Sequence, residues 1–138
     1  MKKRAVLLFT VLGIIMMMIA GCTGSAERQI DPKGFYYSKD EVALFIHLYD
    51  ALPDNYITKE EARKLGWQGG SVERYMRGAA IGGDRYRNYE KKLPENRYWE
   101  CDIDTLGKKS RGDKRLIYSD DGDIYYTDDH YRTFEQLY

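Results

Sequence analysis

The spacing of apolar residues changes near Gly78, and this change constrains the fold more than any other feature of the sequence. Before Gly78, apolar side chains recur at the three- and four-residue intervals of a helix face, as in Val42, Phe45, Ile46 and Tyr49. After it, short runs alternate as strands do. Helices followed by antiparallel strands predict an α+β domain, in which N-terminal helices pack on a C-terminal antiparallel β-sheet.

Two capping boxes indicate where the predicted helices begin. Residues 38–41 (SKDE) precede the first helix, which we expect to end before Pro53. Residues 58–61 (TKEE) precede a second helix, and Gly66 lies just past its expected end. A third, short helical turn is predicted around residues 71–77.

Three runs in the second half of the chain are predicted strands. Residues 98–103 alternate between two faces, with Glu100 on the face opposite Trp99 and Cys101. Residues 114–119 and 123–127 flank Asp120-Asp121-Gly122, and an Asp-Gly pair between two such runs is a strong β-hairpin signal.

Residues 1–21 have the composition of an export signal. Three basic residues precede an apolar run over residues 5–20, which is shorter than the roughly 20 residues of a membrane-spanning helix. The run ends in Ile19-Ala20-Gly21-Cys22, which resembles the lipobox of bacterial lipoproteins. We therefore expect a lipid on Cys22, anchoring to a membrane and a location outside the cytoplasmic membrane. An ordinary cleavage site with secretion, or an uncleaved anchor, are the alternatives.

Residues 22–37 begin with small and polar side chains, so we predict a tether that leads to a domain at residues 38–138. Without residues 1–21 the chain carries 19 basic and 22 acidic residues, a net charge of −3, which argues against a uniformly basic nucleic-acid-binding protein. Residues 85–115 nevertheless carry a net charge of +4, which indicates a local site for a phosphate-bearing ligand. Cys101 is expected to be a small core residue.

Six blocks of sequence, in order, resemble the barnase family of guanyl-preferring microbial ribonucleases. They are residues 52–59 (LPDNYITK), 65–67 (LGW), 81–84 (IGGD), 92–94 (KLP), 115–119 (RLIYS) and 129–134 (DHYRTF). The resemblance covers about residues 38–138, with length changes near residues 68–80 and 105–111. It implies the α+β fold of these enzymes and endonucleolytic cleavage of single-stranded RNA through a 2′,3′-cyclic phosphate, with no metal and no cofactor.

Cleavage of RNA without a metal needs a base for the ribose 2′-hydroxyl, an acid for the leaving 5′-oxygen and cations for the phosphoryl charge. The resemblance implies Glu100 as the base and His130 as the acid. The cations that it implies are Lys59, Arg111 and Arg115. Taken alone, Glu100 could be an ordinary strand carboxylate and His130 an ordinary loop residue, and we expect His47 to be structural or exposed.

The resemblance places guanine recognition in the loop after Tyr86. It implies that Glu90 accepts hydrogen bonds from the base, which selects guanine because N1 of adenine is an acceptor. The further residues implied in substrate binding are Asp84, Tyr86, Arg87, Asn88 and Tyr131. Arg87 and Tyr89 depart from the family pattern, which has a small hydroxyl residue and an arginine at these positions.

The resemblance also implies an inhibitor protein of the barstar type, although the negative charge of this domain weakens its attraction to an acidic inhibitor. We expect a monomer. The alternative from another class is a catalytically inactive lipoprotein that keeps the fold and binds nucleotides or a protein. A toxin domain used against neighbouring cells is a third interpretation. The aspartates of residues 120–129 do not match the calcium-binding EF-hand pattern, so no metal site is expected there.

Overall fold

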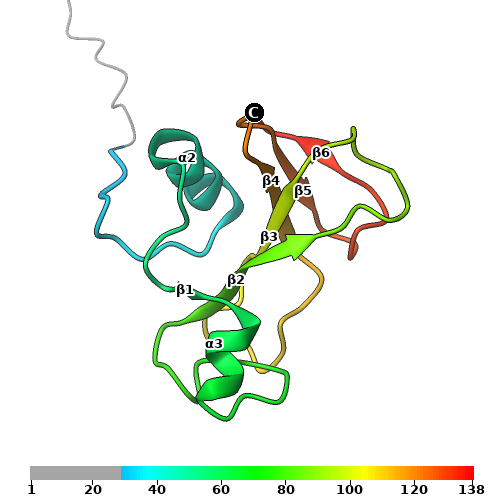
Figure 1. The fold of residues 1–138 in the computed structure, drawn as a ribbon. Helices are drawn as coiled ribbons and strands as arrows, with labels where there is room; N and C mark the ends of the chain where they lie inside the picture. Colours follow the sequence, from blue (N-terminus) through cyan, green and yellow to red (C-terminus); the bar gives the residue numbers. More distant parts are fainter. Residues whose placement is uncertain (1–28) are drawn as a thin grey trace, which may run out of the picture.

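The structure is a computed structural model that describes residues 29–138 (Figure 1). The predicted export signal over residues 1–21, the predicted lipidation site Cys22 and the first part of the predicted tether lie outside the described residues. Within the described part, no helix is both long enough and apolar enough to cross a membrane.

A side-chain cap is present at both predicted helix starts, but only the second forms a complete capping box. Helix α2 (Lys39–Tyr49) follows Ser38, whose hydroxyl accepts a hydrogen bond from the N–H of Glu41 at 3.4 Å. Helix α3 (Lys59–Lys64) follows Thr58, whose side chain accepts from the N–H of Glu61, while the Glu61 carboxylate accepts from the N–H of Thr58 at 2.7 Å. These bonds satisfy N–H groups that have no partner within the helix.

One six-stranded sheet forms the centre of the molecule, with its strands side by side in chain order. The strands are β1 (Tyr56–Ile57), β2 (Ala80–Tyr86), β3 (Tyr98–Asp102), β4 (Arg115–Ser119), β5 (Ile124–Thr127) and β6 (Glu135–Gln136). Only β1 and β2 are parallel, and every other neighbouring pair is antiparallel. The predicted α+β class and the predicted β4–β5 hairpin are confirmed, although each of these two strands begins one residue later than expected.

Residues 71–77 form hydrogen-bonded turns and no helix. The N–H groups of Tyr75 and Met76 both donate to the carbonyl of Val72, at 2.9 and 3.1 Å. Gly70 and Gly78 flank this turn with φ angles of 72° and 76°, outside the right-handed helical region. The predicted third helical turn therefore does not extend into a helix.

Strand β2 is bent at a bulge between Gly82 and Asp84. A Cβ on Gly82 would lie 2.6 Å from the Cβ of Cys101 and 2.6 Å from the ring of Tyr56, so only glycine fits between these strands. Gly83 has a φ of 94°, which other residues rarely adopt. Beyond the bulge, Asp84 pairs directly with Glu100 on β3.

Both faces of the sheet are covered. On one face, α2 packs against Cys101 and other buried side chains of β3, β4 and β5, which confirms the prediction that Cys101 is a core residue. On the other face, Tyr98, Ile117 and Tyr125 form a second cluster, which Tyr131 and Phe134 of the C-terminal loop cover. Helix α3 lies at the β1–β2 end of the sheet (Figure 1). Polar side chains of β3 are therefore largely removed from water.

Part of the predicted tether belongs to the folded domain. Ile30 is buried, and its carbonyl accepts a hydrogen bond from the hydroxyl of Tyr49 at 2.7 Å. The backbone of Tyr36 is bonded through both its N–H and its carbonyl to the buried side chain of Asn55, at 3.3 and 3.0 Å. Residues 30–37 are thus attached to the domain that we expected to begin at residue 38.

Candidate active site

Glu100 lies in the middle of β3, between Asp84 on β2 and Ile117 on β4. It is only 8% exposed, because the C-terminal loop and the side chains of the neighbouring strands surround it. The interpretation of Glu100 as an ordinary solvent-facing strand carboxylate does not hold. A carboxylate in such a place needs partners to remain ionised.

Lys59, at the start of α3, supplies a positive charge to this carboxylate. Its Nζ lies 3.6 Å from Oε1 of Glu100. Its backbone N–H donates to Oδ2 of Asp84 at 3.0 Å, so Asp84 ties the first turn of α3 to β2. The helix dipole disfavours a cation at this end of a helix, and the pairing of Lys59 with Glu100 offsets that cost.

Tyr131 contacts the second oxygen of the same carboxylate. Its hydroxyl donates to Oε2 of Glu100 at 2.7 Å. The ring of Tyr131 stacks on the ring of Tyr86, with centroids 5.2 Å apart and planes 17° from parallel. Burial, and then the negative charge of Glu100, raise the pKa of Tyr131 well above its usual value.

Arg111 and Arg115 share the carboxylate of Asp102, a residue that the sequence analysis did not single out. Asp102 is 2% exposed and accepts from Nε and Nη2 of Arg111 at 2.8 and 2.9 Å. Nε of Arg115 lies 3.0 Å from Oδ1 of Asp102, but the angle is outside hydrogen-bond geometry, and this buried nitrogen has no other partner among the described residues. Arg115 is only 3% exposed and is held by the carbonyl of Lys114 at 2.8 Å.

His130 is carried by a tightly bonded loop after β5. His130 and Tyr131 have φ angles of 55° and 69°, in the left-handed region that few residues other than glycine adopt. Asp129 holds this conformation by accepting from the hydroxyl and the N–H of Thr133, at 2.6 and 2.9 Å. These hydrogen bonds, with others from the same loop, keep the pKa of Asp129 well below its usual value. The N–H of His130 donates to the carbonyl of Asp113 at 3.2 Å.

The side chains of the predicted recognition loop have different roles. Asn88, with a φ of 51°, closes the loop on itself, because its amide donates to the carbonyl of Leu93 at 2.8 Å and accepts from the N–H of Leu93 at 3.2 Å. Glu90 is exposed and pairs with Lys92 at 2.9 Å. Nζ of Lys92 also reaches the carbonyls of Tyr131 and Arg132, at 3.3 and 3.2 Å, so Lys92 links this loop to the His130 loop.

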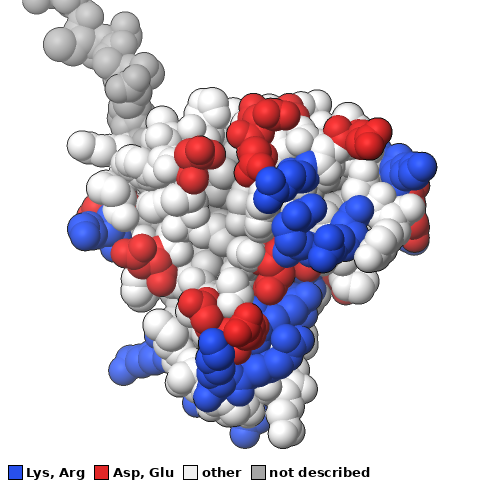
Figure 2. All heavy atoms as spheres, in the orientation of Figure 1, with Lys and Arg blue, Asp and Glu red and all other residues white. Residues whose placement is uncertain are grey.

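One cavity of about 440 Å³ brings these residues together. Every candidate catalytic residue lines it, and so does every candidate substrate-binding residue except Asp84, which lies against the backbone of Lys59. Figure 2 shows Lys and Arg side chains gathered in a band on one side of the face drawn, with acidic side chains beside them. His47 lies outside the cavity, exposed and stacked on Tyr138 with ring centroids 4.1 Å apart, as expected.

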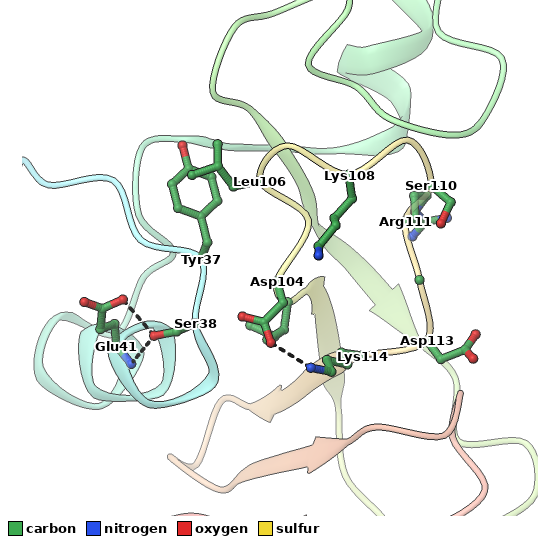
Figure 3. A pocket seen from close by; sticks show the side chains of 12 residues that line it. Tyr37, Ser38, Glu41, Asp104, Leu106, Lys108, Ser110, Arg111, Asp113 and Lys114 are labelled. Atoms are coloured by element: carbon green, nitrogen blue, oxygen red, sulfur yellow. Dashed lines mark hydrogen bonds and ion pairs between the residues drawn. The ribbon is translucent and has the colours of Figure 1, made fainter.

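A second cavity, of about 630 Å³, adjoins the first and shares Arg111 with it (Figure 3). Its wall contains Tyr37, Leu106 and an ion pair between Asp104 and Lys114, with a distance of 3.0 Å. Figure 3 shows the side chain of Lys108 extending into this space. The sequence analysis did not predict this cavity, because it forms between residues 103–114 and the start of α2.

The described residues contain no group of three or more His, Cys, Asp or Glu side chains arranged to bind a metal ion. The candidate catalytic groups around the first cavity are one carboxylate (Glu100), one imidazole (His130) and three cations (Lys59, Arg111 and Arg115). Such a set can remove one proton, supply another and stabilise negative charge on a phosphoryl group.

Comparisons with known proteins point to one family. The model of a family described as ribonuclease matches residues 41–138. Ribonucleases of Heyndrickxia coagulans, Bacillus intermedius and Bacillus pumilus are each 44% identical to the chain over 103 residues, or 71% of its length. The matched segment covers 94% of the Heyndrickxia protein and 63% of each Bacillus protein, so the chain spans less than two thirds of the last two.

Proposed function

The chain belongs to the barnase-like family of microbial ribonucleases, and we propose that it cleaves single-stranded RNA after guanosine, by metal-independent transesterification. The observation that carries this proposal is the meeting of Glu100, His130 and the three candidate cations in one cavity. These are the groups that the reaction needs, and β3, β4, α3 and two loops supply them separately.

In the first step, Glu100 accepts the proton of the ribose 2′-hydroxyl as the 2′-oxygen attacks phosphorus. His130, in its protonated form, gives its proton to the 5′-oxygen as the bond from that oxygen to phosphorus breaks. The products are a 2′,3′-cyclic phosphate and a free 5′-hydroxyl. Because the nucleophile is part of the substrate, correct positioning supplies much of the rate enhancement.

In the second step, the two residues exchange roles. His130 accepts a proton from water as the water oxygen attacks phosphorus, and Glu100 returns a proton to the 2′-oxygen as its bond to phosphorus breaks. A 3′-phosphate results, and both residues regain their starting protonation states. Lys59, Arg111 and Arg115 offset the negative charge of the pentacoordinate phosphorus in both steps.

A preference for guanine rests on Glu90, whose carboxylate can accept from both N1 and the exocyclic amine of that base. The bonds between the Asn88 side chain and Leu93 support a preformed loop, in which backbone groups are available to the base. Tyr86 and Tyr131 already stack on each other, and such rings contribute about 1–3 kcal/mol per stacked base. Arg87 lines the same cavity, where its charge can meet a neighbouring phosphate.

We further propose that the part of the RNA that follows the leaving 5′-oxygen continues into the second cavity. His130 protonates the leaving oxygen, and its backbone is bonded to Asp113, which lines that cavity. Arg111 lines both spaces. A polymeric substrate would thus pass from Glu100 across Arg111 towards Lys108.

The location of the protein remains a proposal that rests on the sequence. An export signal over residues 1–21 and a lipid on Cys22 would hold the enzyme outside the cytoplasmic membrane, with ordinary secretion as the alternative. An enzyme that degrades RNA endangers the cell that makes it before export, so we also propose an inhibitor protein of the barstar type. We propose that the enzyme acts as a monomer.

The test is to incubate the purified protein with an RNA oligomer containing one guanosine and with the matched DNA oligomer, with and without EDTA. We expect cleavage of the RNA alone, after the guanosine and unaffected by EDTA, because DNA lacks the 2′-hydroxyl. Equal cleavage of the DNA would rule out the transesterification. Binding without cleavage of either oligomer would favour the inactive nucleotide-binding alternative.

A further inference from the structure

The two oxygens of the Glu100 carboxylate have different partners. Oε2 accepts a hydrogen bond of 2.7 Å from the Tyr131 hydroxyl, whereas the one partner of Oε1 within residues 29–138 is the more distant Nζ of Lys59, at 3.6 Å. A hydrogen bond of this length to a carboxylate is a strong one. One oxygen is therefore fixed, and the other is left for a further hydrogen bond.

Several contacts hold Tyr131 in the position that this bond requires. Its ring stacks on Tyr86, its N–H donates to the hydroxyl of Thr127 at 3.0 Å, and its carbonyl accepts from Lys92 at 3.3 Å. Its backbone keeps a φ of 69°, a conformation that a non-glycine residue adopts only where the surrounding contacts maintain it. These contacts thus maintain a strained backbone conformation that directs the hydroxyl towards Glu100.

Two consequences follow for Glu100 as the general base. A hydrogen bond donated to a carboxylate favours its charged form, which is the form that accepts a proton. A carboxylate fixed through one oxygen also presents the lone pairs of the other in a constant direction. The raised pKa of Tyr131 means that its hydroxyl remains protonated, and so remains a donor, throughout the neutral range.

We propose that Tyr131 is a positioning residue: its hydroxyl holds Oε2 of Glu100, so that Oε1 faces the ribose 2′-hydroxyl. This role rests on the proposed function and adds to it. It assigns to Tyr131 an action on the general base Glu100, in addition to stacking on a nucleobase of the substrate. Other groups also act on Glu100. Besides Tyr131, the charged and titratable groups around it on the surrounding elements include Lys59, Asp84, Tyr86, Cys101, Asp102, Arg111, Arg115, Tyr118 and His130.

The experiment is Tyr131→Phe, which keeps the ring and its stacking on Tyr86 and removes only the hydroxyl. The carboxyl carbon of Glu100 is followed by NMR across the acidic range, and the pH profile of kcat/KM is measured on a guanosine-containing dinucleoside phosphate. We expect the titration midpoint of Glu100 to rise by about half a unit to one unit, since a donor to its charged form is lost. The midpoint of the acidic limb of the kcat/KM profile should move to higher pH by the same amount.

The matched control is Tyr126→Phe. Tyr126 is on β5, outside the cavity, and its hydroxyl makes no hydrogen bond within residues 29–138, so its removal should change neither measurement. If Tyr131→Phe does not fold, replacing Tyr131 by 3-fluorotyrosine serves instead. This analogue keeps the hydroxyl and makes it a better donor, so the midpoint of Glu100 should fall.

An unchanged Glu100 midpoint in Tyr131→Phe would overturn the inference, and so would a loss of kcat/KM that is equal at every pH. The NMR titration does not depend on turnover. A wild-type protein that fails to cleave RNA would therefore count against the proposed function, and the midpoint of Glu100 would still decide the role of Tyr131.

Discussion

Arg111 places Nε and Nη2 on the two oxygens of Asp102, at 2.8 and 2.9 Å, so the guanidinium and the carboxylate form a bidentate pair. The same carboxylate lies 3.0 Å from Nε of the buried Arg115. Asp102 therefore orients Arg111 and Arg115, although it does not line the cavity itself.

Removal of this carboxylate should be strongly destabilising. Asp102→Ala leaves Arg115 buried and without its counter-charge, and loss of one partner of a buried ion pair costs about 3–5 kcal/mol of unfolding free energy. Urea denaturation measures the change. Lys114→Ala is the control, because it breaks the exposed Asp104–Lys114 pair, which should contribute far less, and it leaves Asp104 with its φ of 57° unchanged. Similar losses in the two variants would contradict this account of Asp102.

The loop that carries His130 should lose stability in acid. Hydrogen bonds from Thr133 keep the pKa of Asp129 below its usual value. Asp129 therefore stabilises the fold above about pH 4, the ordinary range of an aspartate, and this contribution disappears as the pH falls through the lowered pKa of the folded state. The difference in unfolding free energy between wild type and Asp129→Asn should have its largest value at pH 7 and should become smaller below pH 4. A difference that stays constant down to pH 2 would show that the charge of Asp129 is unimportant.

Glu90 should determine base preference more than rate. Glu90→Gln replaces one acceptor oxygen by a donor, so the ratio of kcat/KM for GpA to that for ApA should fall by at least about tenfold. Glu95→Gln is the matched control, since Glu95 is exposed nearby and does not line the cavity. An unchanged ratio in Glu90→Gln would mean that backbone groups alone select the base.

Lys108 should matter only for longer substrates. Lys108→Ala should lower kcat/KM on a guanosine-containing tetranucleotide by about fivefold to tenfold, the loss of one phosphate contact. It should leave the hydrolysis of guanosine 2′,3′-cyclic phosphate unchanged, because that substrate has no nucleotide on the leaving side. Lys109→Ala removes an equal charge next to the cavity and should have little effect. Equal losses from the two variants would indicate general attraction instead of a binding site.

Much of the fold could be predicted from local signals. The caps at Ser38 and Thr58 and the Asp-Gly turn act through hydrogen bonds between residues close in sequence, and the structure has each of them in place, although only Thr58 forms a complete capping box. Boundaries were less accurate. Residues 71–77 form turns and no helix, because Gly70 and Gly78 on either side of them have positive φ angles. Ile30 is buried through contacts with residues more distant in sequence, which no local pattern indicates.

The candidate site was predicted by resemblance, and the structure brings its residues into one cavity. The pairings that Asp102 and Lys92 make could not be predicted. Asp102 and Glu100 have the same spacing on β3 as two ordinary polar strand residues, and their burial depends on residues distant in sequence, such as Tyr131 for Glu100 and Arg111 for Asp102. Lys92 belongs to a block that resembles the family, but its contacts could not be predicted, because its partners are backbone carbonyls 39 and 40 residues away.

The central claim is that Glu100 and His130 exchange protons with one phosphodiester linkage. The most direct test compares wild type, Glu100→Ala and His130→Ala in the cleavage of GpA, with His47→Ala as the control for loss of a histidine outside the cavity. We predict that the first two variants lose about 10²- to 10⁴-fold in kcat, the usual contribution of general acid–base catalysis, and that His47→Ala keeps full activity. Wild-type turnover in the His130→Ala variant would contradict the account.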